Sequence, residues 1–207
     1  MFIIDPKTFY LPRQIRGIIH IGAHECEELS DYNNILKIPI ENIIWIDALE
    51  KKVNIVKKEI PNARIYNACI SNKDNEEVSF MITSNYQSSS ILNFKEHLKE
   101  HPTVFETGRI TLHTKTLNTF YEENKLNPKA YNFMNIDIQG AELKAFQGAS
   151  KILPFIDYIY TEINVKEMYE GCGFIHEIDT FLALYGFKRV QTVMETSGWG
   201  DAFYVRV

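Results

Sequence analysis

Carboxylate side chains follow three apolar runs, at positions where the strands of a parallel sheet would end. Asp47 closes the run IIWI, Asp137 closes FMNI, and Glu142 follows Asp137 after a glycine turn. Glu162 is at the end of the third run, IYTEIN. Ligands of open α/β sheets bind beyond the carboxyl ends of the strands, where an acid can accept hydrogen bonds from ribose hydroxyls. Acids at a strand-to-helix junction can also hold an ammonium, a metal ion or a substrate hydroxyl, or simply cap the next helix.

A short glycine loop precedes Asp47 by the distance typical of nucleoside-binding folds. In HIGAHEC (20–26), Gly22 permits a tight turn and Cys26 stands where a third glycine is usual. Glutamates at positions 25, 27 and 28 suit the helix dipole, but they would repel a pyrophosphate. No lysine or arginine occurs between Ile18 and Leu36. The loop therefore disfavours NAD, FAD and ATP and tolerates S-adenosylmethionine, which carries no phosphate.

Other reactive side chains have simpler explanations. His20 and His24 are four residues apart but straddle a strand-to-loop junction, so they do not form a helical metal pair. Cys26 has no evident base, and the acids around it would raise the pKa of its thiol. His97 and His101 lie in a polar segment and are expected at the surface. These residues are therefore not predicted to act as metal ligands or nucleophiles.

The acceptor side of the site is less strongly marked. Asp137, Glu142 and Glu162 are the candidates for a catalytic carboxylate, and His113 in GRITLHTKT is a weaker one. Asp137 and Glu162 could share a divalent cation, but two acids are too few to predict a metal site. The serines at 88–90 line an acceptor pocket or form a flexible loop.

Strand and helix patterns alternate along the chain. Apolar runs at 15–23, 42–49, 63–71, 131–140 and 155–164 predict buried parallel strands, and amphipathic segments at 24–37, 50–60, 117–126, 141–153 and 175–187 predict helices. The segments 188–195 and 201–207 predict a C-terminal antiparallel hairpin. We therefore expect one α/β domain over 1–207, with about seven mostly parallel strands, an N-terminal arm at 1–14 and an inserted, lid-like segment at 76–115.

Composition narrows the class of protein. The chain has 207 residues, 45% of them hydrophobic, and a net charge of -5, which disfavours a strongly cationic nucleic-acid binder. Three widely spaced cysteines indicate neither a zinc site nor a disulfide framework. No apolar run approaches the roughly 20 residues of a membrane span. We expect a cytoplasmic protein that acts on a small molecule or glycan.

The motifs together resemble the FkbM family of S-adenosylmethionine-dependent methyltransferases over about 17–207. The resemblance rests on HIGAHEC, on Asp47-Ala48, on ACIS (68–71), on SSSIL (88–92) and on NIDIQGAE (135–142) with a later Gly-Ala. It implies a class I, Rossmann-like methyltransferase fold and methyl transfer, for which the catalytic candidates are those named above: Asp137, Glu142, Glu162 and, more weakly, His113. It also implies acceptor contacts from Ser88, Ser89 and Ser90. The implied cofactor contacts are His20, Gly22, Ala23, His24, Asp47, Ala48, Cys69, Ile70, Asp137 and Ile138.

Two functions of different classes follow from this resemblance. The first is methyl transfer from S-adenosylmethionine to a hydroxyl of a sugar, glycan or natural product. The second is a catalytically silent methyltransferase-fold module that binds a partner protein, which the unusual His20, His24 and Cys26 favour. A nicotinamide oxidoreductase is disfavoured by the acidic loop and its missing third glycine.

Overall fold

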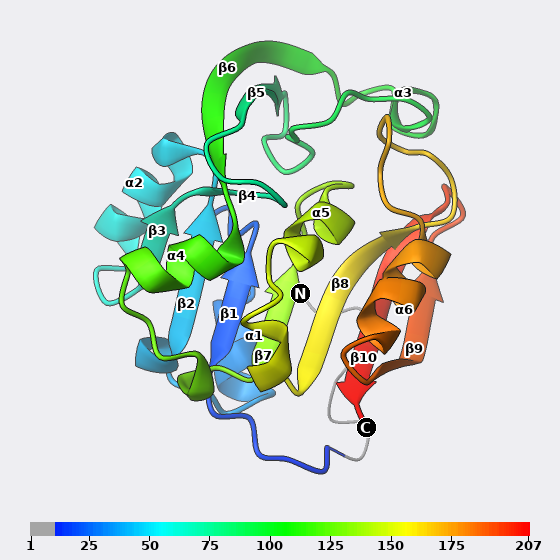
Figure 1. Ribbon diagram of the computed structural model, residues 1–207. Helices are drawn as coiled ribbons and strands as arrows, with labels where there is room; N and C mark the ends of the chain where they lie inside the picture. The colour runs from blue at the N-terminus through cyan, green and yellow to red at the C-terminus, as the bar shows by residue number, and fades with distance from the viewer. Residues whose placement is uncertain (1–10) are drawn as a thin grey trace.

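A seven-stranded sheet forms the centre of the protein in a computed structural model that describes residues 11–207 (Figure 1). The strand order is β3-β2-β1-β7-β8-β10-β9. The first five strands in this order are parallel, and β10 runs antiparallel to both β8 and β9. The strands are β1 (Ile18–Ile21), β2 (Ile43–Asp47), β3 (Arg64–Asn67), β7 (Phe133–Ile136), β8 (Tyr158–Asn164), β9 (Phe187–Met194) and β10 (Trp199–Arg206).

Helices cover both faces of this sheet because alternate side chains of each buried strand point to opposite faces. Ile19 of β1 packs in the core formed with α4 (Leu117–Glu123), α5 (Glu142–Gln147) and α6 (Ile175–Ala183). Its neighbour Ile18 packs in the core formed with α1 (Leu29–Asn34) and α2 (Glu50–Glu59). Three short 3-10 turns, Ile40–Asn42, Pro128–Ala130 and Leu153–Phe155, precede strands β2, β7 and β8. The predicted α/β fold, with a seven-stranded, mostly parallel sheet and a C-terminal antiparallel hairpin, is confirmed.

Several boundaries differ from the sequence prediction; the helices expected over 141–153 and 175–187, for example, are only α5 and α6. The helix expected over 24–37 is only α1, because His24 and Cys26 have left-handed backbone conformations, with φ of 42° and 63°, that a helix cannot contain. The strand expected over 63–71 divides into β3 and a separate two-residue strand, β4 (Cys69–Ile70). The chain therefore leaves the main sheet at Ala68, above the end of β2.

A second sheet, of order β4-β6-β5, lies above the carboxyl ends of the main strands (Figure 1). It contains β5 (Glu77–Thr83) and β6 (Glu106–Lys115), and the segment between them carries the short helix α3 (His97–Glu100). This segment reaches the loop after β8, where the backbone N–H of Lys95 donates to the carbonyl of Met168 at 2.9 Å. The inserted segment predicted at 76–115 thus closes over the edge of the sheet where ligands of this fold bind.

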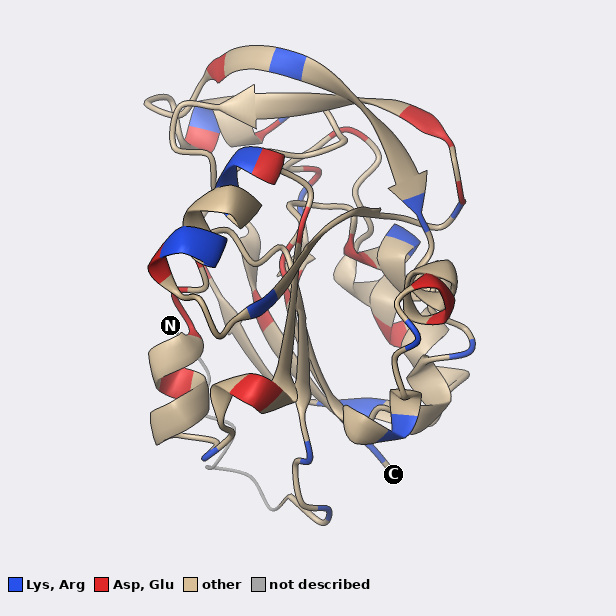
Figure 2. Ribbon diagram, turned by 90° about the vertical axis from the view of Figure 1, so that its left-hand side faces the viewer, with Lys and Arg blue, Asp and Glu red and all other residues tan. Residues whose placement is uncertain are grey.

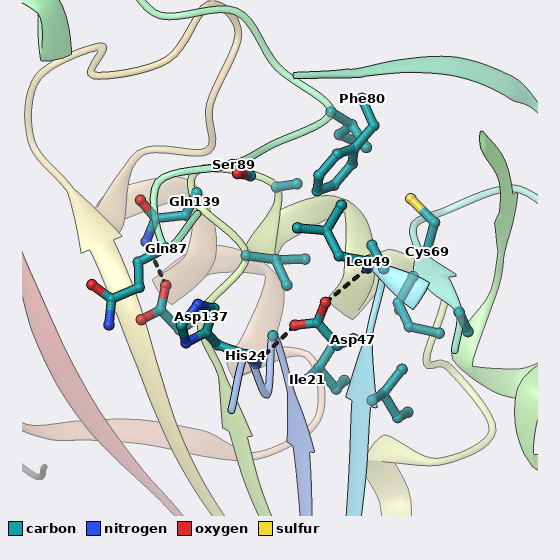
Figure 3. A pocket seen from close by; sticks show the side chains of 18 of the residues that line it. Ile21, His24, Asp47, Leu49, Cys69, Phe80, Gln87, Ser89, Asp137 and Gln139 are labelled. Atoms are coloured by element: carbon teal, nitrogen blue, oxygen red, sulfur yellow. Dashed lines mark hydrogen bonds between the residues drawn. The ribbon is translucent and has the colours of Figure 1, made fainter. Parts of the chain in front are cut away.

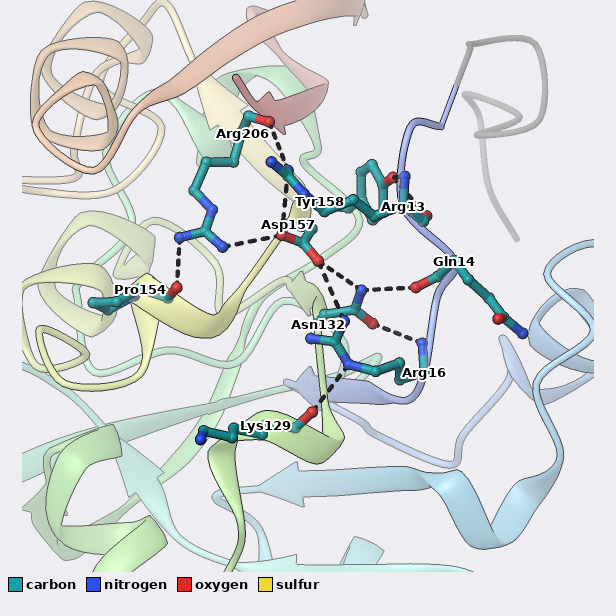
Figure 4. Close-up of polar contacts among 9 residues, drawn as sticks. All are labelled: Arg13, Gln14, Arg16, Lys129, Asn132, Pro154, Asp157, Tyr158 and Arg206. Carbon is teal, nitrogen blue, oxygen red and sulfur yellow. Dashed lines mark hydrogen bonds and ion pairs between the residues drawn. The ribbon is translucent and has the colours of Figure 1, made fainter.

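At the other end of the sheet, where the parallel strands begin, one buried carboxylate joins several segments (Figure 4). Asp157 accepts hydrogen bonds from Asn132 at 2.8 Å and from Arg206 at 3.0 Å. Arg13 and Arg16 add ion pairs at 3.4 and 3.7 Å. These contacts join the segment before β1 to the last strand, far from the ligand-binding edge. Most of the N-terminal arm predicted at 1–14 lies outside the described residues. Among residues 11–207, no helix is long and apolar enough to cross a bilayer.

Candidate functional site

The carboxyl ends of β1 and β7 meet at Gly22, where the order of the strands reverses. Gly22 has φ of +89°, and a Cβ there would lie 1.7 Å from the carbonyl oxygen of Asp137. Only glycine allows this approach between the two backbones. The Gly22 and Ala23 N–H groups donate to the Ile46 carbonyl at 2.9 and 3.0 Å, which ties the same turn to β2. The three strand ends therefore form one rigid floor.

An apolar pocket lies on the β2 side of this floor and encloses about 590 Å³, its open mouth included (Figure 3). Asp47 stands at its edge, and its two carboxylate oxygens accept the backbone N–H groups of His24 and Leu49, each at 2.8 Å. Burial raises the pKa of Asp47, while these two hydrogen bonds act against the shift. The pocket walls are largely hydrophobic; they include Ile21, Ile46, Ala48, Leu49, Ala68, Cys69, Ile70, Phe80, Ile91 and Ile138.

A polar pocket lies on the β8 side and encloses about 1400 Å³, open solvent included. Five residues line both pockets, so the two form one continuous cleft; they are Gly22, His24, Gln87, Asp137 and Gln139. Acidic residues gather at the strand ends beneath it (Figure 2). Within the described chain, no lysine or arginine lines either pocket. The carboxylates that line the polar pocket are Glu27, Glu28, Asp137, Glu162 and Asp201.

Three carboxyl groups, from Asp137, Glu142 and Glu162, meet below the polar pocket. Each offers an oxygen within 4.8 Å of the other two. The Gln139 amide donates to Asp137 at 2.6 Å and to Glu162 at 2.8 Å. Gln139 is held by Tyr169, whose hydroxyl donates to its side-chain oxygen at 2.6 Å. The amide therefore orients two of the three carboxyl groups.

The three carboxyl groups differ in their access to the pocket. The side chain of Asp137 is exposed in the pocket, although many protein atoms lie around it at the bottom of the cleft. The side chains of Glu142 and Glu162 are buried. Burial raises the pKa of all three above the ordinary carboxyl range. Repulsion from Asp137 adds to the pKa shifts of Glu142 and Glu162, whereas repulsion from Asp201 and Glu28 adds to that of Asp137. Asp137 is therefore the most exposed of the three in the cleft, Glu162 reaches the pocket lining with a largely buried side chain, and Glu142 does not line the pocket.

Most predicted cofactor residues lie around the cleft. Asp47, Ala48, Cys69, Ile70 and Ile138 line the apolar pocket. Gly22, His24 and Asp137 line both pockets, and His20 lines the polar one. Ala23 lines neither pocket and is buried behind the turn.

The predicted acceptor-side residues are more dispersed. Ser88 lines the polar pocket and Ser89 the apolar pocket, while Ser90 donates to the Gln139 carbonyl at 2.8 Å from behind the lining. Glu162 lines the polar pocket, and Glu142 lies below it. His113 is exposed on β6, opposite Glu77, and lines neither pocket. The geometry therefore does not bring His113 to the carboxylates.

The expectation that His97 lies at the surface is wrong. Its side chain is only 6% exposed, and its ring stacks on Phe94 with centroids 4.1 Å apart. His97 and His101 both line the polar pocket. Phe94 also contacts Tyr169 from the loop after β8, so the packing of two distant segments buries His97.

Several residues of the cleft were not singled out from the sequence. Gln139 and Asn164 carry no charge. Tyr169 lies in the loop after β8, where the sequence shows no recognisable motif. Gln139 stands inside the quoted motif NIDIQGAE and has a left-handed φ of 56°, so its position beside Gly140 was the available signal. Cys26, by contrast, is buried among the side chains of α1 and β2 and lines neither pocket.

Comparisons with known proteins agree with this geometry. The methyltransferase FkbM domain matches residues 20–189 of the chain. The 2-O-methyltransferase NoeI of Sinorhizobium fredii is 34% identical over 84 residues, which are 41% of this chain and 34% of that protein. The match thus spans about a third of the length of that curated relative.

Solved structures show the same fold. The methyltransferase FkbM from Methylobacillus flagellatus KT superposes with a TM-score of 0.56 at 10% identity, covering 93% of this chain and 44% of that chain. Aeropyrum pernix fibrillarin, solved with S-adenosyl-L-methionine, superposes with a TM-score of 0.50 at 12% identity, covering 94% of this chain and 69% of that chain. With a family match over most of its length and this class I methyltransferase fold, the chain belongs to the FkbM methyltransferase family.

Proposed function

We propose that this protein transfers a methyl group from S-adenosylmethionine to a hydroxyl oxygen of a sugar, glycan or natural-product acceptor. The single observation that carries the proposal is the continuous cleft at the carboxyl ends of β1, β2 and β7. Its apolar half suits an uncharged nucleoside, and its polar half suits a hydroxyl-bearing acceptor. Gly22, at the junction of the two halves, is where the sulfonium would lie.

The apolar pocket supports the nucleoside end of the cofactor. Asp47 uses one lone pair of each oxygen on a backbone N–H, so further lone pairs are available to ribose hydroxyls. Phe80, Ile70 and Ile138 supply flat or branched apolar walls for the adenine. Since no cation lines either pocket in the described chain, a phosphate-bearing cofactor would meet acids alone.

The polar pocket supports the acceptor end. In the proposed reaction the acceptor oxygen bonds to the methyl carbon as the carbon–sulfur bond breaks. The bonding electron pair stays on sulfur, which gives S-adenosylhomocysteine. The hydroxyl proton leaves, and Asp137 is the carboxylate placed to accept a hydrogen bond from that hydroxyl, because it alone of its cluster is exposed in the cleft. Alignment of the reacting atoms is the protein's main contribution.

The silent partner-binding module gains no support from the structure. That hypothesis depended on His20, His24 and Cys26 in the glycine loop. Cys26 lines neither pocket, so its side chain leaves the cofactor cleft open. His24 contributes its backbone N–H to Asp47, a contact that does not depend on side-chain type.

The direct test is methyl transfer from isotopically labelled S-adenosylmethionine to a panel of sugars and oligosaccharides, read by mass spectrometry. We expect a labelled methyl ether on a hydroxyl of one acceptor class. Asp137→Asn is expected to lower kcat by about 10²-fold or more. The matched control is Glu59→Gln, which neutralises an exposed carboxylate at the end of α2.

Labelled product found on nitrogen or sulfur acceptors alone would contradict O-methylation. Unchanged turnover in Asp137→Asn would contradict its assigned role.

A further inference from the structure

The carboxylate cluster has more oxygen ligands than the protein's own donors occupy. Asp137, Glu142 and Glu162 each place an oxygen within 4.8 Å of the others, from the end of β7, the start of α5 and the middle of β8. The Gln139 amide supplies only two N–H donors, and one nitrogen serves both Asp137 and Glu162. The other donors are the Ile138 and Gly140 N–H groups on Glu142 and the Asn164 amide on Glu162. Each carboxylate has about four lone-pair sites, so more than half of the cluster's sites remain available.

Two buried oxygens beside the cluster have no hydrogen-bond partner among the described residues. One is Oε2 of Glu142, a side chain that is fully buried. The other is Oδ1 of Asn164, which is also fully buried and lines the same polar pocket. Asn164 uses its amide nitrogen on Glu162, at 3.5 Å, so its oxygen is the atom left over. Buried polar oxygens without partners are uncommon, and both of these are acceptors that only a donor or a cation can satisfy.

The available ligands are all oxygen. That set suits Mg²⁺, Mn²⁺ or Ca²⁺ and lacks the nitrogen and sulfur ligands of typical zinc sites. In the described chain, no lysine or arginine lines the polar pocket to neutralise the acids instead. We propose that Asp137, Glu142 and Glu162 bind one divalent cation of this oxygen-preferring class at the floor of the acceptor pocket.

The position of the site indicates what the ion would do. Asp137 connects the cluster to the cleft, because its carboxylate is exposed there while the other two are buried. A cation on this cluster would be accessible to an acceptor hydroxyl and would lower the pKa of that hydroxyl. The binding of the ion stands on the cluster alone, whereas this catalytic role rests on the proposed function.

In the experiment, the metal-free full chain is titrated with MnCl₂. Binding is measured by calorimetry and, independently, from the electron paramagnetic resonance signal of free Mn²⁺. We expect one ion per chain, displaced by excess MgCl₂ or CaCl₂. Glu162→Gln and Asp137→Asn, each of similar shape to the native residue, are expected to weaken binding at least tenfold. Glu59→Gln, on the surface of α2, is expected to bind as the native chain does.

Glu142→Gln is read separately, because Oε1 of Glu142 also accepts the Ile138 and Gly140 N–H groups and its loss can unfold the loop. Thermal unfolding of each variant without metal shows whether it is folded. The proposal is overturned if the native chain binds no Mn²⁺ at millimolar concentration, or if the folded Glu162 and Asp137 variants bind it unchanged. Methyl transfer that persists in EDTA would overturn the catalytic role of the ion and leave the proposed function standing. Mn²⁺ binding without methyl transfer to any acceptor would overturn the proposed function and leave the cation site standing.

Discussion

The buried His97 predicts a specific pH dependence of stability. Burial and, to a smaller extent, the charge of the neighbouring His101 together lower the pKa of His97 from its ordinary 6.5 to about 4. The groups packed around it are the rings of Phe94, His101 and Tyr169, none of which is an acid that would stabilise an imidazolium. Its Nδ1 has no hydrogen-bond partner among the described residues, so replacement by Phe removes no hydrogen bond at that atom.

The sign follows from proton binding. Below pH 6.5 the unfolded chain binds a proton at His97 that the folded chain does not, so the free energy of unfolding falls as the pH falls toward 4. One pKa unit corresponds to about 1.4 kcal/mol, so the loss between pH 6.5 and pH 5 is about 2 kcal/mol. His97→Phe lacks this titration. Relative to the native chain, the variant is therefore expected to gain about 2 kcal/mol between pH 8 and pH 5.

The assay is urea unfolding of both chains at pH 8 and pH 5, with the change in the difference between them as the readout. His113→Phe is the control, because His113 is exposed on β6. A difference between native chain and His97→Phe that stays constant across this range would refute the reasoning. An NMR titration giving His97 a pKa of 6 or above would refute it as well.

Three further substitutions test other parts of the structure. Gly22→Ala is expected to cost about 1–3 kcal/mol in backbone strain alone, with its Cβ contact to the Asp137 carbonyl adding to this; an unchanged melting temperature would show that the strand ends are not so close. Asp157→Asn is expected to lower the free energy of unfolding by about 1–3 kcal/mol, because it removes charged hydrogen bonds while the arginines stay partly in water. If urea unfolding gives a loss that does not change with salt concentration, the ionic contribution is contradicted. Phe80→Ala is expected to weaken S-adenosylhomocysteine binding about tenfold by removing an apolar wall, and calorimetry giving native affinity would remove Phe80 from the adenine site.

The sheet was predictable because its strands are buried on both faces and bounded by turns. IIWI and FMNI are short, mostly apolar runs, and such runs between helical patterns leave few alternatives to a parallel sheet. The start of α1 was not predictable, because His24 and Cys26 have left-handed conformations in the turn after β1. That turn is held by the hydrogen bond from the His24 N–H to Asp47 at the end of β2. The split at Ala68 depends on the pairing of β4 with β6, whose partners Cys69 and Thr114 are 45 positions apart in the sequence.

From residue chemistry alone, the site was predictable where a charged residue ended a strand, and the family resemblance added uncharged residues such as Gly22 and Ile70. Asp47 and Asp137 were found in this way, and both line the cleft. Their assigned roles stay predictions. His97 was wrongly expected at the surface, because its neighbours in the sequence are polar and its contacts with Phe94 and Tyr169 arise only in the folded chain. Gln139 was missed because an uncharged amide shows its importance only through the carboxylates that it joins.

Binding of S-adenosylhomocysteine measured by calorimetry tests the central claim most directly. The account predicts one molecule bound per native chain, unchanged in Glu59→Gln. In Asp47→Asn it predicts binding weaker by about 10- to 100-fold, the loss expected when a hydrogen bond to a charged group is removed. Thermal unfolding must show that this variant is folded, since Asp47 also anchors His24 and Leu49. Absence of binding to the native chain at millimolar ligand, or equal affinity in folded Asp47→Asn, would contradict the account.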